Sequence, residues 1–397
     1  MLIHWIWLSR LSGIRTEQKL ALLRIFRDPE EIYKADPCAF SAVEGLTAKE
    51  LQSLEDRELH SARKILADCA EKNISILTYG DAAYPARLKN IAHPPIVLYY
   101  KGCLPDWESV PVIGVVGTRK ASAYGLQTAK QLGYQIAACG ALVVSGGADG
   151  IDTKALEGAL QAHKRVVIVL GFGADVVYPA KNRALFEMVE KQGCLLTEYV
   201  PGTPPNSWNF PQRNRIISGL SCGTVIVEAP ERSGALNTAR HTLEQGRDVF
   251  VVPGNVDSVS SAGSNQLLRE GAIPVFSGWD IVSQYEYLYP GFVRRVDTAM
   301  GETALKQPSV FPKAETKTDN KSIDNPEKSR YSVEDNKALN LTEEEKTVIS
   351  HLTQQPVHVD QVIAAAGMPA GKVLSVLTML AMKGAVKNHP GKCISLK

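Results

Sequence analysis

Two short apolar runs, each followed by a glycine-containing turn, constrain the fold of this chain more than any other feature. The first run covers residues 112–116 and leads into the turn 117–119, after which apolar residues recur at helical spacing. The second run covers residues 142–144 and leads into the turn 145–148. Successive strand–turn–helix units predict a parallel sheet, in which both turns lie at the carboxyl edge where such folds bind ligands.

The residue types in these turns favour an anion-binding site. Free backbone N–H groups and the start of a helix attract phosphate, and the guanidinium of Arg119 suits a phosphate in bidentate geometry. The first turn lacks the G-x-G-x-x-G fingerprint of dinucleotide folds, and the second strand ends in Ser145 instead of an acid. The nearest fragment to a Walker A motif, 367–373, lacks a Ser or Thr after Lys372. The alternative interpretation is that the glycines only form tight turns, as we expect for Gly140.

Alternating strands and helices continue along the middle of the chain. Apolar, strand-like runs at 165–170, 195–198, 224–229 and 249–252 are separated by helical patterns. This alternation predicts an α/β domain over residues 76–297, with an extended Rossmann-like, doubly wound parallel sheet. A chain of 397 residues, 44% of them hydrophobic, is long enough for this domain and one or two smaller ones.

Residues 1–75 predict an all-helical N-terminal domain of the helix-hairpin-helix or SAM-like kind. Two apolar-x-Gly-apolar turns, 11–14 and 43–46, each precede a helical pattern, and Thr47 stands at capping-box spacing from Glu50. In a helix-hairpin-helix the glycine lets backbone amides face a phosphate. A plain helical packing domain explains the same residues, because neither turn has the usual second glycine. Both interpretations stay open.

The C-terminal part contains a predicted linker and a small domain. Residues 298–338 lose apolar periodicity and are mostly charged or polar, which predicts a flexible linker. Residues 339–397 show three helical patterns and a hairpin turning at residues 390–391, an arrangement that predicts a winged helix. The exposed face of its third helix offers few polar residues, so DNA binding and protein docking both remain open. These residues are Lys372, Ser375, Thr378 and Lys383.

Charge and cysteine content limit the partners and the compartment. The net charge is only +2, so a nucleic-acid surface has to be local. The 7 cysteines are scattered without C-x-x-C or His spacing, which predicts no metal site and suits a reducing cytoplasm. The apolar start, residues 1–8, is too short for a signal peptide or a membrane span, so we expect a cytoplasmic protein without a membrane partner.

Several motifs of the central region occur in an order that one protein family shares. They include GTRKASAYG (117–125), SGGADGID (145–152), FPQRNRIISGLS (210–221) and GSNQLLREGA (263–272). The chain therefore resembles the DNA-processing protein A family (DprA, also called Smf). The resemblance implies an extended Rossmann fold that binds single-stranded DNA, protects incoming DNA in natural transformation and loads the RecA recombinase. It also implies a homodimer formed through the central domain.

The resemblance places nucleic-acid-binding residues on the two turns, at a basic position beside them and in the RNRIIS stretch. One arginine of that stretch is also a candidate for an ion-paired structural residue, and the sequence leaves open which one. Trp208 and Phe210 are able to stack on bases, although sealing the core is the favoured interpretation for Phe210. The predicted set is Gly117, Thr118, Arg119, Ser145, Gly146, Gly147, Ala148, Lys181, Asn182, Asn214, Arg215 and Gly234.

A nucleotide hydrolase is the competing hypothesis. The fold resembles that of the LOG-type nucleotide phosphoribohydrolases, whose signature P-G-G-x-G-T-x-x-E follows a strand. Thr238 stands at the position of the catalytic glutamate, and Glu228 belongs to the strand. Without a carboxylate there, charge that develops on the ribose lacks its stabiliser, so we expect no enzymatic activity and no cofactor. A third hypothesis, a sequence-specific repressor, is disfavoured by the few basic residues on the third helix of the winged helix.

Residues late in the α/β domain form the predicted dimer interface. Leu267 and Leu268 are adjacent on a short helix and point about 100° apart, so one can enter the core while the other faces outward. Together with Ile273 they form the candidate contact surface. The alternative interpretation is that both leucines belong to the core.

Overall fold

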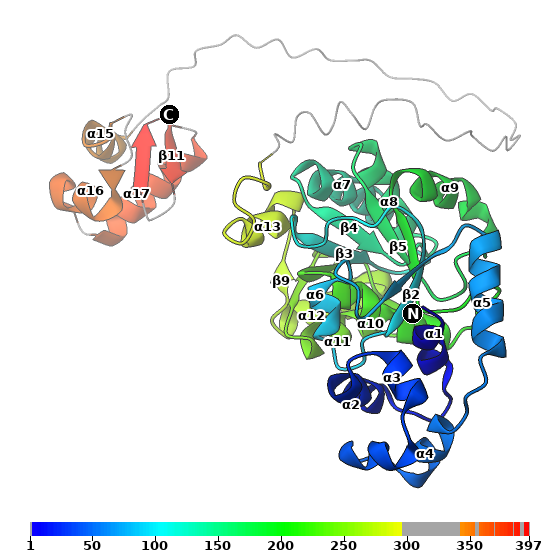
Figure 1. The fold of residues 1–397 in the computed structure, drawn as a ribbon. Helices are drawn as coiled ribbons and strands as arrows, with labels where there is room; N and C mark the ends of the chain where they lie inside the picture. Colours follow the sequence, from blue (N-terminus) through cyan, green and yellow to red (C-terminus); the bar gives the residue numbers. More distant parts are fainter. Residues whose placement is uncertain are drawn as a thin grey trace, which may run out of the picture. The chain divides into compact units, whose positions relative to one another are not determined.

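The structure, a computed structural model, describes residues 2–295, 342–353, 357–368, 370–383, 385–389 and 393–396. The predicted linker, 298–338, lies outside these residues. The described residues up to 295 belong to one compact unit, and those from 342 onward belong to a second (Figure 1).

Nine strands of the described residues form one sheet at the centre of the first unit (Figure 1). Their order is β1-β2-β6-β5-β4-β3-β7-β8-β9, and all neighbours from β6 to β9 pair in parallel, which confirms the predicted doubly wound sheet. Strands β4 and β7 lie on opposite sides of β3, which creates a topological switch point there. The strands are β1 (Ser75–Thr78), β2 (Val97–Gly102), β3 (Val112–Val116), β4 (Leu142–Ser145), β5 (Val166–Leu170), β6 (Cys194–Thr197), β7 (Gly223–Ile226), β8 (Asp248–Val251) and β9 (Ile273–Pro274).

One end of the sheet differs from a purely parallel arrangement. Strand β2 pairs antiparallel with β6, placing Tyr99 opposite Thr197, and β1 pairs antiparallel with β2. The sheet is therefore mixed, with an antiparallel pair added to one edge of a parallel core.

Helices cover both faces of the sheet (Figure 1) because alternate residues of a strand point to opposite sides. Ile113 and Val115 of β3 belong to a buried cluster with α7, α8 and α9, whereas Val112 and Val116 belong to another with α10 and α11. Each helix after a parallel strand begins near the carboxyl edge of the sheet. The helices are α6 (Ala86–Lys89), α7 (Ala123–Ala138), α8 (Ile151–Gln161), α9 (Arg183–Gln192), α10 (Asn209–Leu220), α11 (Gly234–Glu244), α12 (Ala262–Arg269) and α13 (Gly278–Val282).

The N-terminal region is helical, as the sequence predicts. Its helices pack on the antiparallel end of the sheet, since Ile6, Leu22 and Leu54 share one buried cluster with Val97 and Tyr99 of β2. The helices are α1 (Leu2–Arg10), α2 (Thr16–Phe26), α3 (Pro29–Lys34), α4 (Ala48–Leu54) and α5 (His60–Glu71), with the 3-10 helix η1 (Pro37–Ala42).

A buried carboxylate joins the two glycine turns of this region. Glu50 accepts hydrogen bonds from the backbone N–H of Arg15 at 3.2 Å and from that of Thr47 at 2.9 Å. Arg15 Nε donates to the same carboxylate at 3.0 Å, and this hydrogen bond lowers the pKa of Glu50 to about 2. Because the chain itself occupies these amides, the structure favours the packing interpretation of the two turns over a phosphate site.

The second unit is a winged helix, as the sequence predicts. Its three described strands pair in the order β10-β12-β11. Lys372 of α17 forms an ion pair with Glu344, and Lys383 forms one with Glu345, both glutamates lying on α15. The basic side chains predicted on the third helix are thus partly neutralised. The elements are α15 (Glu343–Ser350), β10 (Val357–His358), α16 (Val359–Ala366), α17 (Ala370–Met382), β11 (Val386–His389) and β12 (Cys393–Leu396).

Across both units, the described helices include none with the length and apolar character that a membrane crossing requires.

Candidate nucleic-acid interface

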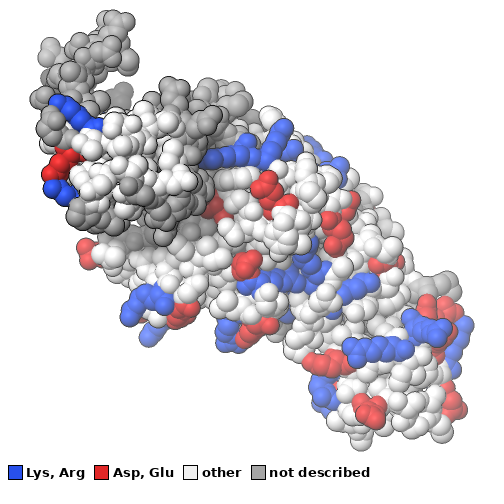
Figure 2. Space-filling model, turned by 90° about the vertical axis from the view of Figure 1, so that its left-hand side faces the viewer, with Lys and Arg blue, Asp and Glu red and all other residues white. Residues whose placement is uncertain are grey.

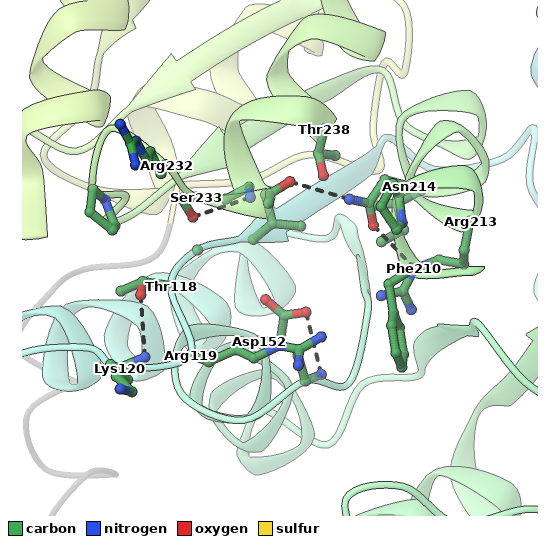
Figure 3. A pocket seen from close by; sticks show the side chains of 18 of the residues that line it. Thr118, Arg119, Lys120, Asp152, Phe210, Arg213, Asn214, Arg232, Ser233 and Thr238 are labelled. Atoms are coloured by element: carbon green, nitrogen blue, oxygen red, sulfur yellow. Dashed lines mark hydrogen bonds between the residues drawn. The ribbon is translucent and has the colours of Figure 1, made fainter. Parts of the chain in front are cut away.

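A cavity of about 800 Å³ opens at the switch point beside β3. Its walls come from the turns after β3, β4 and β7, from α10 and from the start of α11 (Figure 3). Cationic side chains outnumber carboxylates among the described lining residues, and two aromatic rings join them. This composition suits an anionic ligand with flat apolar groups. The residues concerned are Arg119, Lys120, Arg213, Arg232, Asp152, Tyr178 and Phe210.

The first turn is held in place by packing against α8 and by backbone hydrogen bonds. A Cβ at Gly117 would lie 2.5 Å from Ile151 Cγ1, so only glycine lets the turn approach α8 this closely. The Thr118 N–H donates to the Glu228 carbonyl at 2.8 Å, and the Lys120 N–H donates to Thr118 Oγ1 at 3.2 Å. These contacts hold the backbone of the turn while the side chains that follow Thr118 remain exposed.

Two guanidinium groups contact the ring of Phe210. The guanidinium carbon of Arg119 lies 5.1 Å from the ring centre and that of Arg213 lies 6.0 Å from it. Arg119 is exposed and comes from the first turn, whereas Arg213 is 4% exposed and belongs to α10. Figure 3 shows Arg119 extending toward the side of the cavity that carries Phe210 and Arg213. A cation–π contact at an exposed site contributes roughly 0.5–1 kcal/mol. Such a contact orients the Arg119 side chain before a ligand binds, and it is weak enough for a ligand to displace the side chain.

The second turn is organised by Asp152. Its Oδ2 accepts hydrogen bonds from the N–H of Gly146 at 3.1 Å and from that of Ala148 at 3.4 Å. Burial raises the pKa of Asp152 to about 6, while the nearby Arg213 and the backbone donors oppose the rise. The amides of this turn therefore face a carboxylate of the chain.

Two further predicted residues hold the same turn from behind. The fully buried Ser145 hydroxyl donates to the Val115 carbonyl at 2.6 Å. Asn182 Nδ2 donates to the Gly147 carbonyl at 3.1 Å and to Thr153 Oγ1 at 2.8 Å. These side chains shape the turn instead of lining the cavity.

Helix α10 ties the cavity wall to the sheet. Arg213 donates to the Gly146 carbonyl at 2.9 Å and also to the Val169 carbonyl. Burial lowers its pKa to about 10, so it remains a cation at neutral pH. Asn214 Nδ2 donates to the Gly234 carbonyl at 3.3 Å and thereby joins α10 to the first residue of α11.

The start of α11 forms the third wall. Ser233 caps this helix, its Oγ accepting from the Ala235 N–H at 3.2 Å, and the positive end of the helix dipole favours an anion. Arg232 is exposed and lies across the opening from Phe210 (Figure 3). Thr238, at the position of the hydrolase glutamate, also lines the cavity and is 1% exposed.

The structure brings only half of the predicted binding residues to the cavity wall. Ser145, Gly146, Gly147 and Asn182 lie behind it, within or against the second turn. Lys181 is exposed and forms an ion pair with Asp149. The predicted residues on the wall are Gly117, Thr118, Arg119, Ala148, Asn214 and Gly234.

Arg215 lies away from this cavity. It forms an ion pair with Glu198 at 2.6 Å, which identifies it as the ion-paired arginine that the sequence left open. Arg213 faces the cavity in its place, because residues two positions apart on a helix point about 200° apart. Sequence reasoning missed Arg213, Asp152 and Arg232 as lining residues. Arg213 and Asp152 belong to the quoted motifs, so the motifs pointed to these residues but did not show that their side chains line the cavity.

The predicted dimer residues lie at the open edge of the sheet. β9 pairs only with β8 among the described strands, and Ile273 on β9 is 37% exposed. Leu267 and Leu268 are both half-buried against the cluster under α10 and α11. Leu267 and Ile273 also line a cavity of about 200 Å³ beside the exposed Leu243.

One face of the molecule carries charges of both signs. On the face shown in Figure 2, Lys and Arg side chains alternate with Asp and Glu side chains instead of forming one basic field. The face shown thus carries no single-sign field, and the described residues that line the cavity have a local excess of cations. The described residues contain no cluster of His, Cys, Asp or Glu side chains that could hold a metal ion.

Known proteins share both the sequence and the fold. Residues 75–286 match the family described as DNA recombination-mediator protein A, and residues 334–392 match the DprA winged helix domain. The chain is 31% identical over 395 residues to Protein Smf of Synechocystis, covering 98% of this chain and 97% of that protein. It is 36% identical over 265 residues to the DNA processing protein DprA of Bacillus subtilis, covering 64% of this chain and 88% of that protein. The X-ray structure of DprA from Streptococcus pneumoniae matches with a TM-score of 0.63 and 31% identity, over 72% of this chain and 98% of that chain.

Proposed function

This chain belongs to the DNA recombination-mediator protein A (DprA/Smf) family, and we propose that it binds single-stranded DNA in the cavity beside β3. The observation that carries the proposal is the placement of Arg119 against Phe210 on one wall of a cationic cavity. A phosphate can draw Arg119 off the ring without breaking an ion pair, since no carboxylate of the described residues lies within salt-bridge distance of its guanidinium. The ring surface released in this way is then open to a base.

A single strand suits this site better than a duplex. The rings of Phe210 and Tyr178 lie 5.9 Å apart, and Trp208 is 66% exposed beside the start of α10. Aromatic rings stack on bases that are unpaired, whereas a duplex keeps its bases inside. The cations Arg119, Lys120 and Arg232 contact phosphates and carry no sequence code, so binding is expected to be independent of sequence.

The wider role is also a proposal. A cytoplasmic homodimer that protects incoming single strands in natural transformation and loads the RecA recombinase follows from the resemblance of the motifs. The two relatives named DNA processing protein support a role in DNA handling. Two cavities in one dimer would hold a long strand more tightly than one cavity alone.

We propose a binding role without catalysis. Thr238 provides no carboxylate where the LOG-type hydrolases have one. Asp152, the carboxylate among the described lining residues, is buried and already accepts backbone hydrogen bonds. An attacking water therefore lacks an accessible general base on the described wall.

A direct test titrates the full-length protein with a labelled single-stranded oligonucleotide and with the blunt duplex of the same sequence. We expect tighter binding to the single strand, with an affinity that falls as salt rises. Release of base or phosphate from nucleoside monophosphates and ATP is assayed in parallel. Equal or tighter binding to the duplex argues against the proposed ligand, and turnover that a cavity mutation abolishes argues for the hydrolase.

A further inference from the structure

A second, smaller cavity of about 140 Å³ lies where the N-terminal helices meet the antiparallel end of the sheet. It lies on the other side of α10 from the larger cavity beside β3, here called the DNA cavity. Arg215 lines the smaller cavity, whereas Arg213 and Asn214 line the DNA cavity. A water molecule occupies about 30 Å³ of liquid volume, so the space accommodates one small polyatomic ion. Its polar lining residues are Ser9, Arg10, Thr16, Lys19, Tyr99, Glu198 and Arg215.

Lys19 is the most unusual group in this lining. It is 8% exposed, and its Nζ donates one hydrogen bond, at 2.9 Å, to the Ser9 carbonyl. No carboxylate of the described residues lies within 4 Å of this ammonium group. Burial, and after it the charge of Arg10, lower the pKa of Lys19 to about 8. A buried cation without a counter-charge is costly, and a bound anion would remove that cost.

Tyr99 brings an unsatisfied hydroxyl to the same cavity. The residue is 1% exposed, and its hydroxyl lies near the Ser9 hydroxyl, which already donates to the Ile6 carbonyl; the two do not reach full hydrogen-bond geometry. Burial raises its pKa, so it is a neutral O–H donor. Buried polar groups without a hydrogen-bond partner are rare in folded proteins, and an acceptor bound in the cavity would supply a partner to this hydroxyl.

The remaining charges leave the cavity positive. Glu198 is already paired with Arg215 at 2.6 Å, whereas Arg10 and Lys19 have no such partner among the described residues. Thr16 and Lys19 are the first and fourth residues of α2, close to the positive end of its dipole. A cation there is unfavourable, and an anion is favourable. Waters alone would satisfy the Tyr99 hydroxyl but would leave this charge uncompensated.

We propose that this cavity binds a phosphate-class oxyanion between Lys19, Tyr99 and Arg10. The anion supplies a negative charge to both cations and an acceptor to the tyrosine hydroxyl. It thereby bridges α1 and α2 of the helical region to β2 of the sheet. The proposal does not depend on DNA binding at the other cavity. The phosphate is either a free ion or a backbone group of a bound strand, and the two sources give different results in the test.

The test titrates the full-length Arg119→Ala protein with inorganic phosphate, so that the DNA cavity contributes little. Binding is followed by the thermal midpoint and by calorimetry, with chloride replacing phosphate at equal ionic strength. We expect saturable stabilisation, with phosphate affinity reduced at least about tenfold by Lys19→Met and by Tyr99→Phe. Lys49→Met, which removes an exposed lysine from α4 of the same region, should leave the affinity unchanged.

A second titration distinguishes the source of the phosphate. Single-stranded DNA is added to proteins with Arg119 intact. If the strand supplies the group, Lys19→Met weakens DNA binding and lowers its salt dependence by about one counterion. If the free ion is the ligand, DNA affinity stays at the wild-type value while phosphate binding is lost. Tyr99→Phe removes one oxygen and keeps the packing, so it serves if Lys19→Met does not fold. Unchanged phosphate and DNA binding in either folded variant would overturn the proposal.

Discussion

The guanidinium carbon of Arg119 lies 5.1 Å from the centre of the Phe210 ring, although the two residues come from different elements of the fold. Arg119 belongs to the turn after β3, and Phe210 is the second residue of α10. The contact places the cation that would bind a phosphate and the ring that would stack on a base within one short span.

Arg119→Ala should weaken the binding of single-stranded DNA more than any other single substitution in the cavity. The loss of a charge-assisted hydrogen bond to phosphate costs about 1.5–3 kcal/mol. Fluorescence anisotropy at fixed salt measures the change. Lys181→Ala is the matched control, because Lys181 is exposed outside the cavity wall and paired with Asp149, and its effect should be smaller. A folded Arg119→Ala protein with wild-type affinity would show that the site is assigned wrongly.

Phe210→Leu should reduce the affinity for a single strand by about 1–3 kcal/mol, because leucine retains apolar packing but removes the stacking surface. Phe210→Tyr keeps the ring and should bind nearly as well. Both variants are compared in the same anisotropy assay, after circular dichroism has confirmed their folding. Equal binding by the leucine and tyrosine variants would mean that Phe210 only seals the core.

Affinity for single-stranded DNA should rise as pH falls through the pKa of Asp152, which burial raises to about 6. Protonation removes the negative charge of this lining residue while the lining arginines stay charged. Neutralising one charge about 4–10 Å from a phosphate changes the affinity by roughly two- to sixfold with the dielectric constant of bulk water, and by more at a lower effective dielectric. Titrations between about pH 7.5 and about pH 5.5 measure this gain.

Asp152→Asn is the control for this pH dependence. The amide is neutral throughout, so binding should be stronger near neutral pH and flat across the same range. A wild-type slope that persists in the folded Asp152→Asn protein would assign the titration to another group. Asparagine also keeps one oxygen acceptor for the backbone donors of the second turn.

Glu50→Gln should destabilise the helical region at neutral pH. The folded-state pKa of Glu50 is about 2, below the ordinary value of 4.5, so its contribution is present above about pH 4.5 and is lost as pH falls toward 2. We expect the free energy of unfolding to fall by about 1–2 kcal/mol near neutral pH, less than the full pKa shift corresponds to because the Arg15 side chain is exposed, and to change little near pH 2. Denaturant titrations at both pH values measure this. Glu44→Gln, in the neighbouring turn and exposed, should have no comparable effect.

Ile273→Arg should convert the proposed dimer into a folded monomer. The residue is exposed on the open edge strand, so arginine is tolerated in the monomer but places a charge in the contact. Light scattering gives the mass, and binding to long oligonucleotides should weaken with the loss of the second cavity. Leu267→Arg and Leu268→Arg are less decisive because both side chains are half-buried. An unchanged dimer in the Ile273→Arg protein would reject this surface.

The parallel part of the sheet was predictable because its strands are fully buried and therefore appear as continuous apolar runs. The run at 112–116 is β3, and that at 165–170 contains β5. The antiparallel pairing of β2 with β6 was not predictable, since apolar periodicity carries no strand direction. The two glycine turns of the helical region were found, but the amides that directly follow them, those of Arg15 and Thr47, are occupied by Glu50, which spacing alone did not show.

The cavity was predictable in position but not in detail. Both turns meet at the switch point because the carboxyl ends of neighbouring parallel strands share one edge. Ser145 was assigned to the ligand, yet its hydroxyl faces the Val115 carbonyl, because the residue still belongs to β4. Asp152 and Arg213 influence each other's pKa across a long stretch of sequence, and only the folded chain brings them together.

The position of the cations has a consequence for substitutions in the cavity. Arg119, Lys120 and Arg232 all stand on turns beyond the ends of strands, where substitutions leave the sheet undisturbed. Substitutions at these positions can therefore change the ligand specificity of the cavity while the sheet stays the same. Arg213 is under a different constraint, because it holds the carbonyls of Gly146 and Val169 inside the protein. A substitution at Arg119, Lys120 or Arg232 should therefore change binding with little effect on folding, whereas a substitution at Arg213 should change both.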